Sequence, residues 1–394
     1  MAHNGQATKI SRFRATYMKP KAIEVFAGAG GLSLGLKRAG FDIILANELE
    51  KDFAQTYKAN HSSTKVICAD IRSVDFKNEI EKLGLQKIDL LSGGPPCQGF
   101  STIGAKKEHD PRNNLFQEYL RAVSETNPNF IIFENVSGFK KLYKGKAFKS
   151  IVNGLNELGF NTYESILEAS DFGLPQKRER MIIVGWKKEF IDIKRPNPTH
   201  SDIHTIFGSM KKLTLIDAIS DLPELGANDS KSLYKTEPQN EFQKSARLNS
   251  YKLTEHNSSN YGSKMLEILS LIPEGGTIEN IPEELRPKNY FKNTYARLHP
   301  DKPSPTITRN FGTPSSSRCV HPFQNRALST REGARLQGFP DNYQFFGSKT
   351  SKNLQIGNAV PPILGEVVGK EIIKSISLTK ELSKVRSQIF EITD

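Results

Sequence analysis

The sequence predicts an α/β fold built on a mainly parallel, doubly wound sheet. Short apolar runs alternate with loops and helical stretches over about residues 20–185. A glycine-rich turn or a polar side chain follows several of these runs, at the sheet edge where open α/β sheets bind ligands. The length of 394 residues leaves room for a second, smaller domain or a long insertion.

The first apolar run leads into a glycine-rich turn. Residues 22–35 predict a strand, the turn and the start of a helix. Gly28, Gly30 and Gly31 would let a ligand approach the backbone, with helix N–H groups facing it. The spacing departs from the dinucleotide-binding pattern G-x-G-x-x-G, because Ser33 occupies the position of its last glycine.

The next two predicted strands each end at a carboxylate. Residues 43–46 are followed by Glu48, about 20 positions after the turn, where an acid can accept hydrogen bonds from ribose hydroxyls. Residues 65–68 are followed by Asp70, which is suited to accept a hydrogen bond from an exocyclic amine.

Cys97 lies just after the fourth predicted strand. The run from Ile88 to Leu91 is stopped by the sequence Gly-Gly-Pro-Pro at 93–96. The two prolines stiffen the loop that presents the thiol. Such a thiol can act as a nucleophile if nearby positive charge or a helix amino end lowers its pKa.

The remaining sheet elements follow the same alternation. Leu115 belongs to a helix and can pack against a flat ring. The fifth strand ends at Glu134, and Arg178 and Arg180 precede another apolar strand. The expected segments are a strand at 129–133, a helix at 148–158, a strand within 161–174 and a strand at 181–184.

The second half has a different character. Pro, Ser, Asn and Lys dominate residues 196–295, which indicates a less regular domain with side chains available for bases and phosphates. A purely structural insertion is the alternative. Ser329 and Thr330 are candidate caps of a helix at 328–339. A terminal helix follows Pro362 and is expected to end near Ser375.

Composition indicates the class of partner and the cellular compartment of the protein. Lys and Arg exceed Asp and Glu by 12, which favours a polyanionic partner and nucleic acid before a membrane surface. We expect no membrane segment, because no run of about 18 apolar residues occurs. Cys68, Cys97 and Cys319 are too widely spaced for a disulfide framework or a zinc site, so we expect a reducing cytoplasm and no bound metal.

Five motifs in a fixed order resemble those of the DNA (cytosine-5)-methyltransferases. They are Phe-Ala-Gly-Ala-Gly-Gly, Gly-Pro-Pro-Cys-Gln-Gly-Phe-Ser, Glu-Asn-Val, Gln-Lys-Arg-Glu-Arg and Gln-Ile-Gly-Asn-Ala-Val-Pro-Pro. The resemblance covers about residues 20–185 and 297–365. The chain is similar to the compact bacterial or phage restriction-modification type.

The resemblance implies a Rossmann-like S-adenosylmethionine-dependent methyltransferase sheet, including an antiparallel late strand, with an inserted smaller target-recognition domain. We expect four segments: a basic N-terminal arm at 1–20, a catalytic domain at 21–215, a target-recognition domain and hinge at 216–345, and a return to the catalytic domain at 346–394.

The implied cofactor is S-adenosylmethionine. Glu48 would hold the ribose hydroxyls and Asp70 the adenine amine. The full expected set is Phe26, Ala27, Gly28, Gly30, Gly31, Glu48, Leu49, Asp70, Ile71, Gly94, Pro96, Leu115, Asn358, Ala359 and Val360.

The implied chemistry is covalent. C5 of cytosine is a poor nucleophile, and addition of the Cys97 thiolate to C6 would activate it as an enamine. Glu134 would bind N3 and the exocyclic amine, with a pKa raised by burial. Arg178 and Arg180 would hold the base O2 and a phosphate, and would help to keep Cys97 ionised.

Double-stranded DNA is the expected partner, with the target base extruded from the duplex. Expected DNA contacts are Gln98, Ser101, Arg112, Gln176, Arg297, Thr306 and Thr308. We also expect a monomer and a companion restriction endonuclease that acts on the same site.

Four alternative functions are less favoured by the sequence. A zinc nucleobase deaminase needs Pro-Cys-x-x-Cys, but Phe100 stands at the second cysteine position. A dinucleotide-dependent oxidoreductase would leave Cys97, Glu134 and the two arginines unexplained. The tRNA-methylating branch of the family typically carries a Cys-Phe-Thr tripeptide, which this chain lacks. A DNA-binding paralogue without activity is the fourth.

Overall fold

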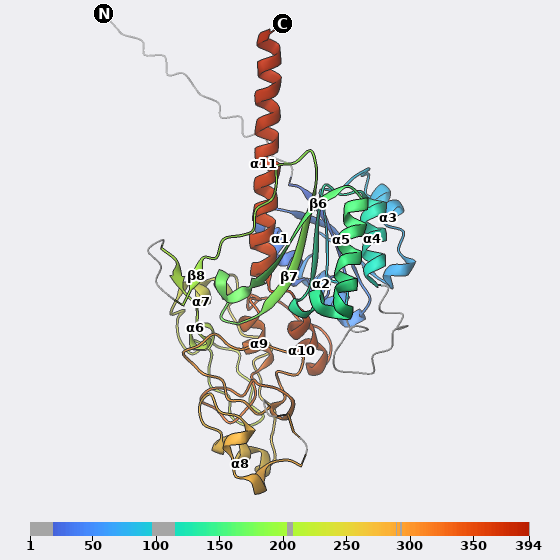
Figure 1. Ribbon diagram of the computed structural model, residues 1–394. Helices are drawn as coiled ribbons and strands as arrows, with labels where there is room; N and C mark the ends of the chain where they lie inside the picture. Colours follow the sequence, from blue (N-terminus) through green and yellow to red (C-terminus); the bar gives the residue numbers. More distant parts are fainter. Residues whose placement is uncertain (1–18, 97–114, 203–207, 289, 292–293, 394) are drawn as a thin grey trace, which may run out of the picture.

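A seven-stranded sheet organises the first half of the chain (Figure 1). The structure, a computed structural model, describes residues 19–96, 115–202, 208–288, 290–291 and 294–393. The strand order is β3-β2-β1-β4-β5-β7-β6. The first five strands of this order run parallel, and β7 pairs antiparallel with both β5 and β6. The predicted sheet and its antiparallel late strand are therefore confirmed.

The strands and helices of the sheet are short and regular. The strands are β1 Lys21–Val25, β2 Asp42–Glu48, β3 Lys65–Cys68, β4 Leu90–Gly93, β5 Phe130–Val136, β6 Phe160–Glu168 and β7 Glu179–Lys187. The helices between them are α1 Gly31–Ala39, α2 Lys51–Asn60, α3 Phe76–Lys82, α4 Leu115–Thr126 and α5 Lys146–Glu157.

Alternating apolar side chains give the sheet two buried faces. Leu91, Ile131 and Phe133 belong to the core beneath α3, α4 and α5. Leu90 and Phe130 belong to the opposite core, which α1 and the C-terminal helix α11 (Pro362–Thr393) cover. Successive strand residues point to opposite faces, so central strands buried on both sides read as continuous apolar runs.

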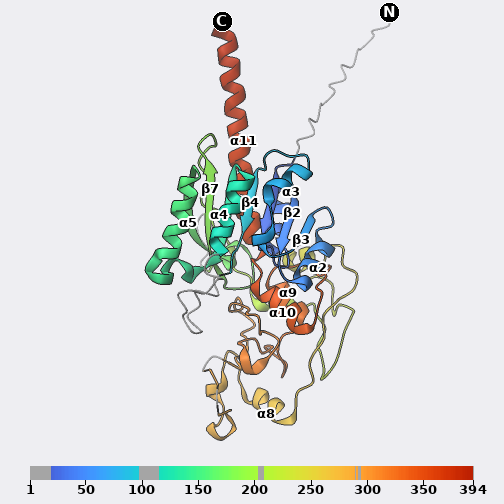
Figure 2. The same cartoon turned by 90° about the vertical axis from the view of Figure 1, so that its right-hand side faces the viewer.

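A loop-rich region, described over residues 208–288, 290–291 and 294–361, lies at one end of the sheet (Figures 1 and 2). Its helices and strand are β9 Met210–Lys211, α6 Leu215–Ile219, α7 Glu241–Ala246, α8 Ser263–Leu271, α9 Thr330–Leu336 and α10 Lys349–Asn358, and β9 pairs with β8 His200–Ser201. Ser329 caps α9 and forms a capping box with Glu332, as expected. Separate apolar clusters surround α9 and α8.

The terminal helix differs from its prediction. It spans Pro362–Thr393 rather than ending near Ser375. Figures 1 and 2 both show its last turns projecting beyond the sheet, at the end of the molecule opposite α8. In the described part of the chain, no helix combines the length and apolar character that a bilayer crossing requires.

Candidate active site

A cavity of about 920 Å³ opens at the carboxyl edge of β1, β2, β4 and β5. Both regions contribute to its wall: the sheet supplies the turns after its strands, and the loop-rich region supplies residues 306–309 and 354–360. The expected site residues on its wall are Phe26, Ala27, Gly28, Gly31, Glu48, Leu49, Asp70, Ile71, Gly94, Pro96, Leu115, Glu134, Arg178, Arg180, Thr306, Thr308, Asn358, Ala359 and Val360.

The glycine turn is shaped by close backbone packing. Gly28 and Gly30 have φ values of 56° and 85°, in the left-handed region that glycine tolerates. A Cβ on Gly31 would lie 2.3 Å from the carbonyl oxygen of Val360, so the two ends of the chain meet there. Gly30 does not line the cavity, contrary to expectation. It packs over His61, and a Cβ there would lie 2.4 Å from the ring.

Glu48 is fixed at the end of β2 by two backbone donors. Its Oε2 accepts a hydrogen bond from the N–H of Gly28 at 2.7 Å, and its Oε1 accepts from Glu50 at 2.9 Å. Burial raises the pKa of this carboxyl, and these bonds to its ionised form oppose the rise. A carboxylate offers about four lone pairs, so acceptors remain for hydroxyls that enter the cavity.

Asp70 lies on the cavity wall with a partner that the sequence did not suggest. Arg72 donates to it from the backbone and from its guanidinium, with Nη2 at 2.5 Å from Oδ2. These bonds lower the pKa of Asp70 to about 2. The carboxylate is thus ionised, and Arg72 competes for its lone pairs.

These residues fit S-adenosylmethionine. Gly28, in the turn before α1, lines the cavity and has no side chain. The cofactor can therefore approach the backbone closely there. Glu48 and Asp70 supply the acceptors that hydroxyl and amine groups need. Leu49, 58 % exposed, and Ile71 supply apolar surface for a flat ring.

Glu134 and Arg180 form an ion pair at the end of β5. The Nε of Arg180 is 2.7 Å from Oε1 of Glu134, and both side chains are about one-tenth exposed. Burial raises the pKa of Glu134, and the charges of Arg180 and Arg178 oppose that rise. A Cβ on Gly94 would lie 2.6 Å from Oε2 of Glu134, so the loop that leads to position 97 touches this carboxyl.

Cys97 itself lies outside the described residues, as do Gln98, Ser101 and Arg112. The structure does describe their approach: β4 ends at Gly93, and the side-chain amide of Asn135 donates to the carbonyl of Pro95 at 3.0 Å. The loop before Cys97 is therefore anchored beside Glu134.

Arg178 departs from its expected role. It is 1 % exposed, and its guanidinium donates to the carbonyl oxygens of Ile307, Gly357 and Ala359 at 2.7 to 3.0 Å. Its terminal nitrogens join the residue just before β7 to both loop-rich segments of the cavity wall, so we assign it a positioning role and not a contact with phosphate.

The structure contradicts two of the predicted DNA contacts, Gln176 and Arg297. Gln176 is fully buried, donates to Leu336 and Gln337, and accepts from the N–H of Ile307. Arg297 is 7 % exposed, and its guanidinium donates to the carbonyls at the end of α8 and to the segment 321–325. Both side chains are enclosed and hydrogen-bonded within the protein, so neither is free to reach a DNA base or phosphate.

Two further residues near the cavity were missed. Glu24 on β1 is 3 % exposed and lines its floor, and burial raises its pKa to about 8. Its neighbour Ser33, the residue that breaks the glycine pattern, donates to it. Tyr343 of the loop-rich region donates to the carbonyl of Ala29 in the glycine turn. Glu24 could have been found from the sequence, because it is an acidic residue within an apolar strand. Nothing in the sequence indicated that Tyr343 contacts the glycine turn.

No group of three or more His, Cys, Asp or Glu suited to a metal ion occurs within the ranges that the structure describes.

Comparisons with known proteins agree with this geometry. The model of the family described as C-5 cytosine-specific DNA methylase matches residues 20–374. The Type II methyltransferase M1.HphI of Haemophilus parahaemolyticus is 35% identical over 368 residues, covering 93% of this chain and 90% of that protein. The Type II methyltransferase M.DdeI of Desulfomicrobium norvegicum is 33% identical, covering 89% and 88%.

Solved structures share the fold. A crystal structure described as a prophage-encoded DNA modification methyltransferase (E. coli) superimposes with a TM-score of 0.73 at 27% identity, covering 91% of this chain and 99% of that one. The S. pombe Dnmt2 methyltransferase gives 0.54 at 20% identity, covering 91% and 98%, which shows the fold alone. The chain therefore belongs to the C-5 cytosine-specific DNA methylases and is an S-adenosylmethionine-dependent DNA (cytosine-5)-methyltransferase.

Proposed function

We propose that Cys97 is the nucleophile of this methyltransferase and that the Glu134–Arg180 pair holds the target cytosine against it. The observation that carries the proposal is the ion pair at the cavity wall, with Glu134 touching the loop that leads to Cys97. Cys97 thiolate adds to C6, and Glu134 protonates or hydrogen-bonds N3, so that C5 becomes nucleophilic. Bound S-adenosylmethionine supplies an electrophilic methyl group.

The raised pKa of Glu134 suits this role. Burial favours its neutral form, which can donate to N3, whereas Arg180 stabilises the carboxylate that remains after donation. Loss of the C5 proton and elimination of the thiolate then restore the aromatic ring and the free enzyme.

We assign cofactor binding to the cavity residues named above. Glu48 holds the ribose hydroxyls, and Asp70, freed in part from Arg72, accepts from the adenine amine. Asn358, Ala359 and Val360 close the methionine end, because Gly31 packs directly on Val360. One chain supplies all of these side chains, so a single copy suffices for one catalytic site.

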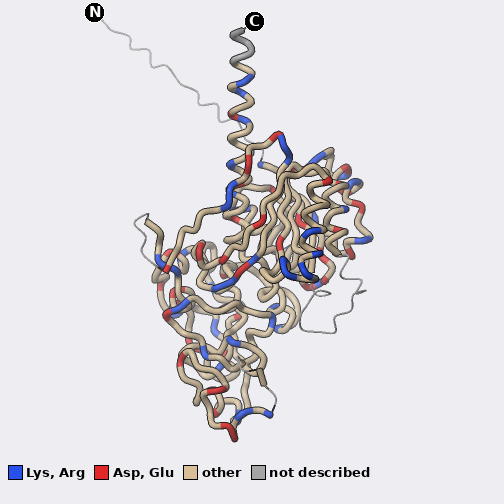
Figure 3. Tube along the Cα trace, in the orientation of Figure 1, with Lys and Arg blue, Asp and Glu red and all other residues tan. Residues whose placement is uncertain are grey.

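We propose that duplex DNA lies between the two regions, with the domain limits expected from the sequence. Thr306 and Thr308 reach the cavity wall from the loop-rich region, where we place target recognition. Lys and Arg alternate with Asp and Glu along both regions (Figure 3), so phosphate contacts are distributed rather than confined to one uniform basic stretch.

The biological setting follows from the relatives, which are Type II methyltransferases. We propose that the chain works in the cytoplasm and methylates sites that a companion restriction endonuclease would otherwise cleave.

Bisulfite sequencing of plasmid DNA from cells that express the chain tests this function. We expect protected cytosines in one recurrent sequence context with the wild type and none with Cys97→Ser. Cys319→Ser is the matched control, since that thiol is buried and away from the cavity, and it should methylate normally. Unprotected cytosines with the wild type, or protection that survives Cys97→Ser, would overturn the proposal.

A further inference from the structure

The last turns of α11 carry an apolar stripe that the body of the protein does not cover. Leu378, Leu382 and Val385 are 38 %, 50 % and 51 % exposed. At 3.6 residues per turn these three side chains fall within about 60° of one another around the helix. The described side chains from 381 to 388 are all exposed.

The docked part of α11 reaches Thr379, beside the first residue of the stripe. Val368, Ile372 and Ile376 are buried in the sheet core, and the hydroxyl of Thr379 accepts from the N–H of Ile191 at 3.0 Å. The helix then continues to Thr393. Most helical stability in proteins comes from packing of an apolar face, and a partner on the stripe would supply that packing to the last turns.

The stripe continues one side of the docked face. Ser375, which is buried and donates to the carbonyl of Ile191, lies one heptad before Leu382 and about 20° from it around the helix. From residue 381 to 388 the described side chains of α11 are exposed, so a partner can reach the stripe there.

The spacing of the stripe is that of a coiled coil. With Leu378 and Val385 at d positions, Leu382 falls at a. In this register Glu381 occupies a g position and Arg386 the following e position.

The charges beside the stripe favour a second copy of the chain, in parallel orientation, as the partner. In a parallel pair, a g residue faces the partner's e residue five positions later, which sets Glu381 of each copy opposite Arg386 of the other. In an antiparallel pair g residues face g residues and e residues face e residues, so Glu381 would not meet Arg386. We propose that α11 forms a short parallel two-stranded coiled coil with α11 of a second copy, in place of the monomer expected from the sequence.

Sedimentation velocity of the full chain, from about 1 to about 100 µM, tests the proposal because two heptads support only a modest affinity. We expect concentration-dependent dimers in the wild type and monomers in Leu382→Lys throughout. Ser387→Lys is the matched control: it adds the same charge on the opposite side of the helix and should dimerise like the wild type. Circular dichroism and methylation of plasmid DNA confirm that each variant is folded.

Charge reversal tests the orientation. Glu381→Arg and Arg386→Glu should each weaken the dimer by several-fold, and the double variant should restore it. A monomeric wild type at the highest concentration would overturn the proposal, and so would a dimer that Leu382→Lys leaves intact. Failure of the double variant to recover would overturn the parallel pairing.

Discussion

The two regions of this enzyme are stabilised in different ways. The sheet region buries continuous apolar strands between helices, and its polar side chains gather at one edge around the cavity. The loop-rich region has smaller apolar clusters and adds buried arginines that donate to carboxylates and backbone carbonyls. In the sheet region Arg180 belongs to the site through its pair with Glu134, whereas buried arginines of the loop-rich region often replace missing secondary structure.

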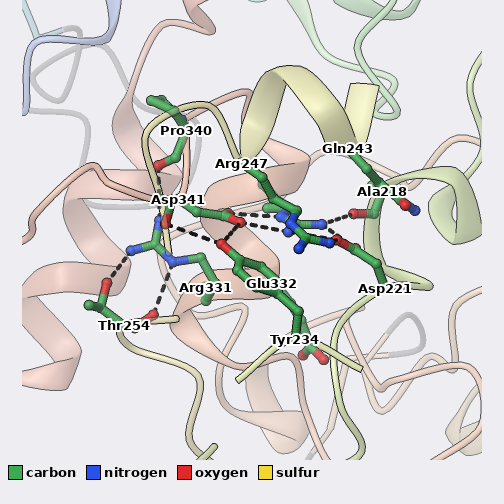
Figure 4. Close-up of polar contacts among 12 residues, drawn as sticks. Ala218, Asp221, Tyr234, Gln243, Arg247, Thr254, Arg331, Glu332, Pro340 and Asp341 are labelled. Atoms are coloured by element: carbon green, nitrogen blue, oxygen red, sulfur yellow. Dashed lines mark hydrogen bonds and ion pairs between the residues drawn. The ribbon is translucent and has the colours of Figure 1, made fainter. Parts of the chain in front are cut away.

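The clearest example surrounds α9. Arg335 is fully buried between Asp221 and Asp341, with N–O distances of 2.5 and 2.6 Å. Figure 4 shows these two aspartates with Tyr234 and Arg247 beside them, joining α9 to the segments around α6 and α7. Tyr234 donates to Asp341 at 2.8 Å, and the guanidinium of Arg247 lies 3.7 Å from the centre of the Tyr234 ring.

Replacing Arg335 by Met should have the largest effect. It leaves two buried carboxylates without their cation, which costs about 3–5 kcal/mol of unfolding free energy. Lys244→Met, which breaks an exposed pair with Glu241, should cost about 1 kcal/mol or less. Chemical denaturation of both variants measures the difference; equal losses would contradict the structural role of the buried network.

Arg297→Met sharpens the comparison, because this residue was expected to contact DNA. Its hydrogen bonds to the carbonyls of Leu269 and Ile272 hold the end of α8, and their loss should cost about 2–4 kcal/mol. At a temperature where the variant remains folded, its DNA affinity should equal that of the wild type. If Arg297→Met left the free energy of unfolding unchanged but weakened DNA binding, Arg297 would be a DNA contact after all.

Glu48→Ala probes the sheet edge. Loss of hydrogen bonds to a charged acceptor, each about 1.5–3 kcal/mol, should weaken S-adenosylmethionine binding tenfold or more. Binding of duplex DNA should change little, since the side chain lies at the end of β2 on the cavity wall. Titration calorimetry with each ligand separates the two effects, and equal losses would remove Glu48 from the cofactor site.

Glu24→Gln tests the pH dependence of stability in the sheet region. The pKa of Glu24 is raised from 4.5 to about 8 by burial, so the folded state keeps a proton that the unfolded chain has lost. The stability it contributes is present below about pH 4.5 and is lost as pH rises towards 8, by at most about 1.4 kcal/mol per unit.

The glutamine variant should lack this part of the slope. We expect denaturation from about pH 5 to about pH 8 to show that the free energy of unfolding of the variant rises relative to that of the wild type as pH rises. A constant difference between the two would contradict a buried, protonated Glu24.

The sequence predicted the sheet well because its strands are buried on both faces. Runs such as Phe130–Phe133 can be recognised without knowing their neighbours, and the position of Glu134 at the strand end followed directly. Glu48 and Asp70 were placed on the cavity wall by the same rule. The periodicity of apolar residues is a local property, so it can be recognised in a single sequence.

The loop-rich region could not be predicted in this way. A lone arginine in a polar segment looks the same whether its partner is a phosphate or a carbonyl, and the partners of Arg297 and Arg178 lie 24 to 181 residues away. The terminal helix was ended too early because its last turns are highly charged, although Leu378 and Leu382 continue an apolar spacing.

The central claim is that the chemistry belongs to the sheet edge and passes through the thiol of Cys97. The most direct measurement is covalent trapping, with a duplex that carries 5-fluorocytosine at the methylated position and with S-adenosylmethionine present. We predict a denaturation-resistant adduct whose peptide mass maps to Cys97 and which Cys97→Ser does not form. A wild-type enzyme that methylates the normal duplex but forms no adduct, or an adduct at another residue, would contradict the account.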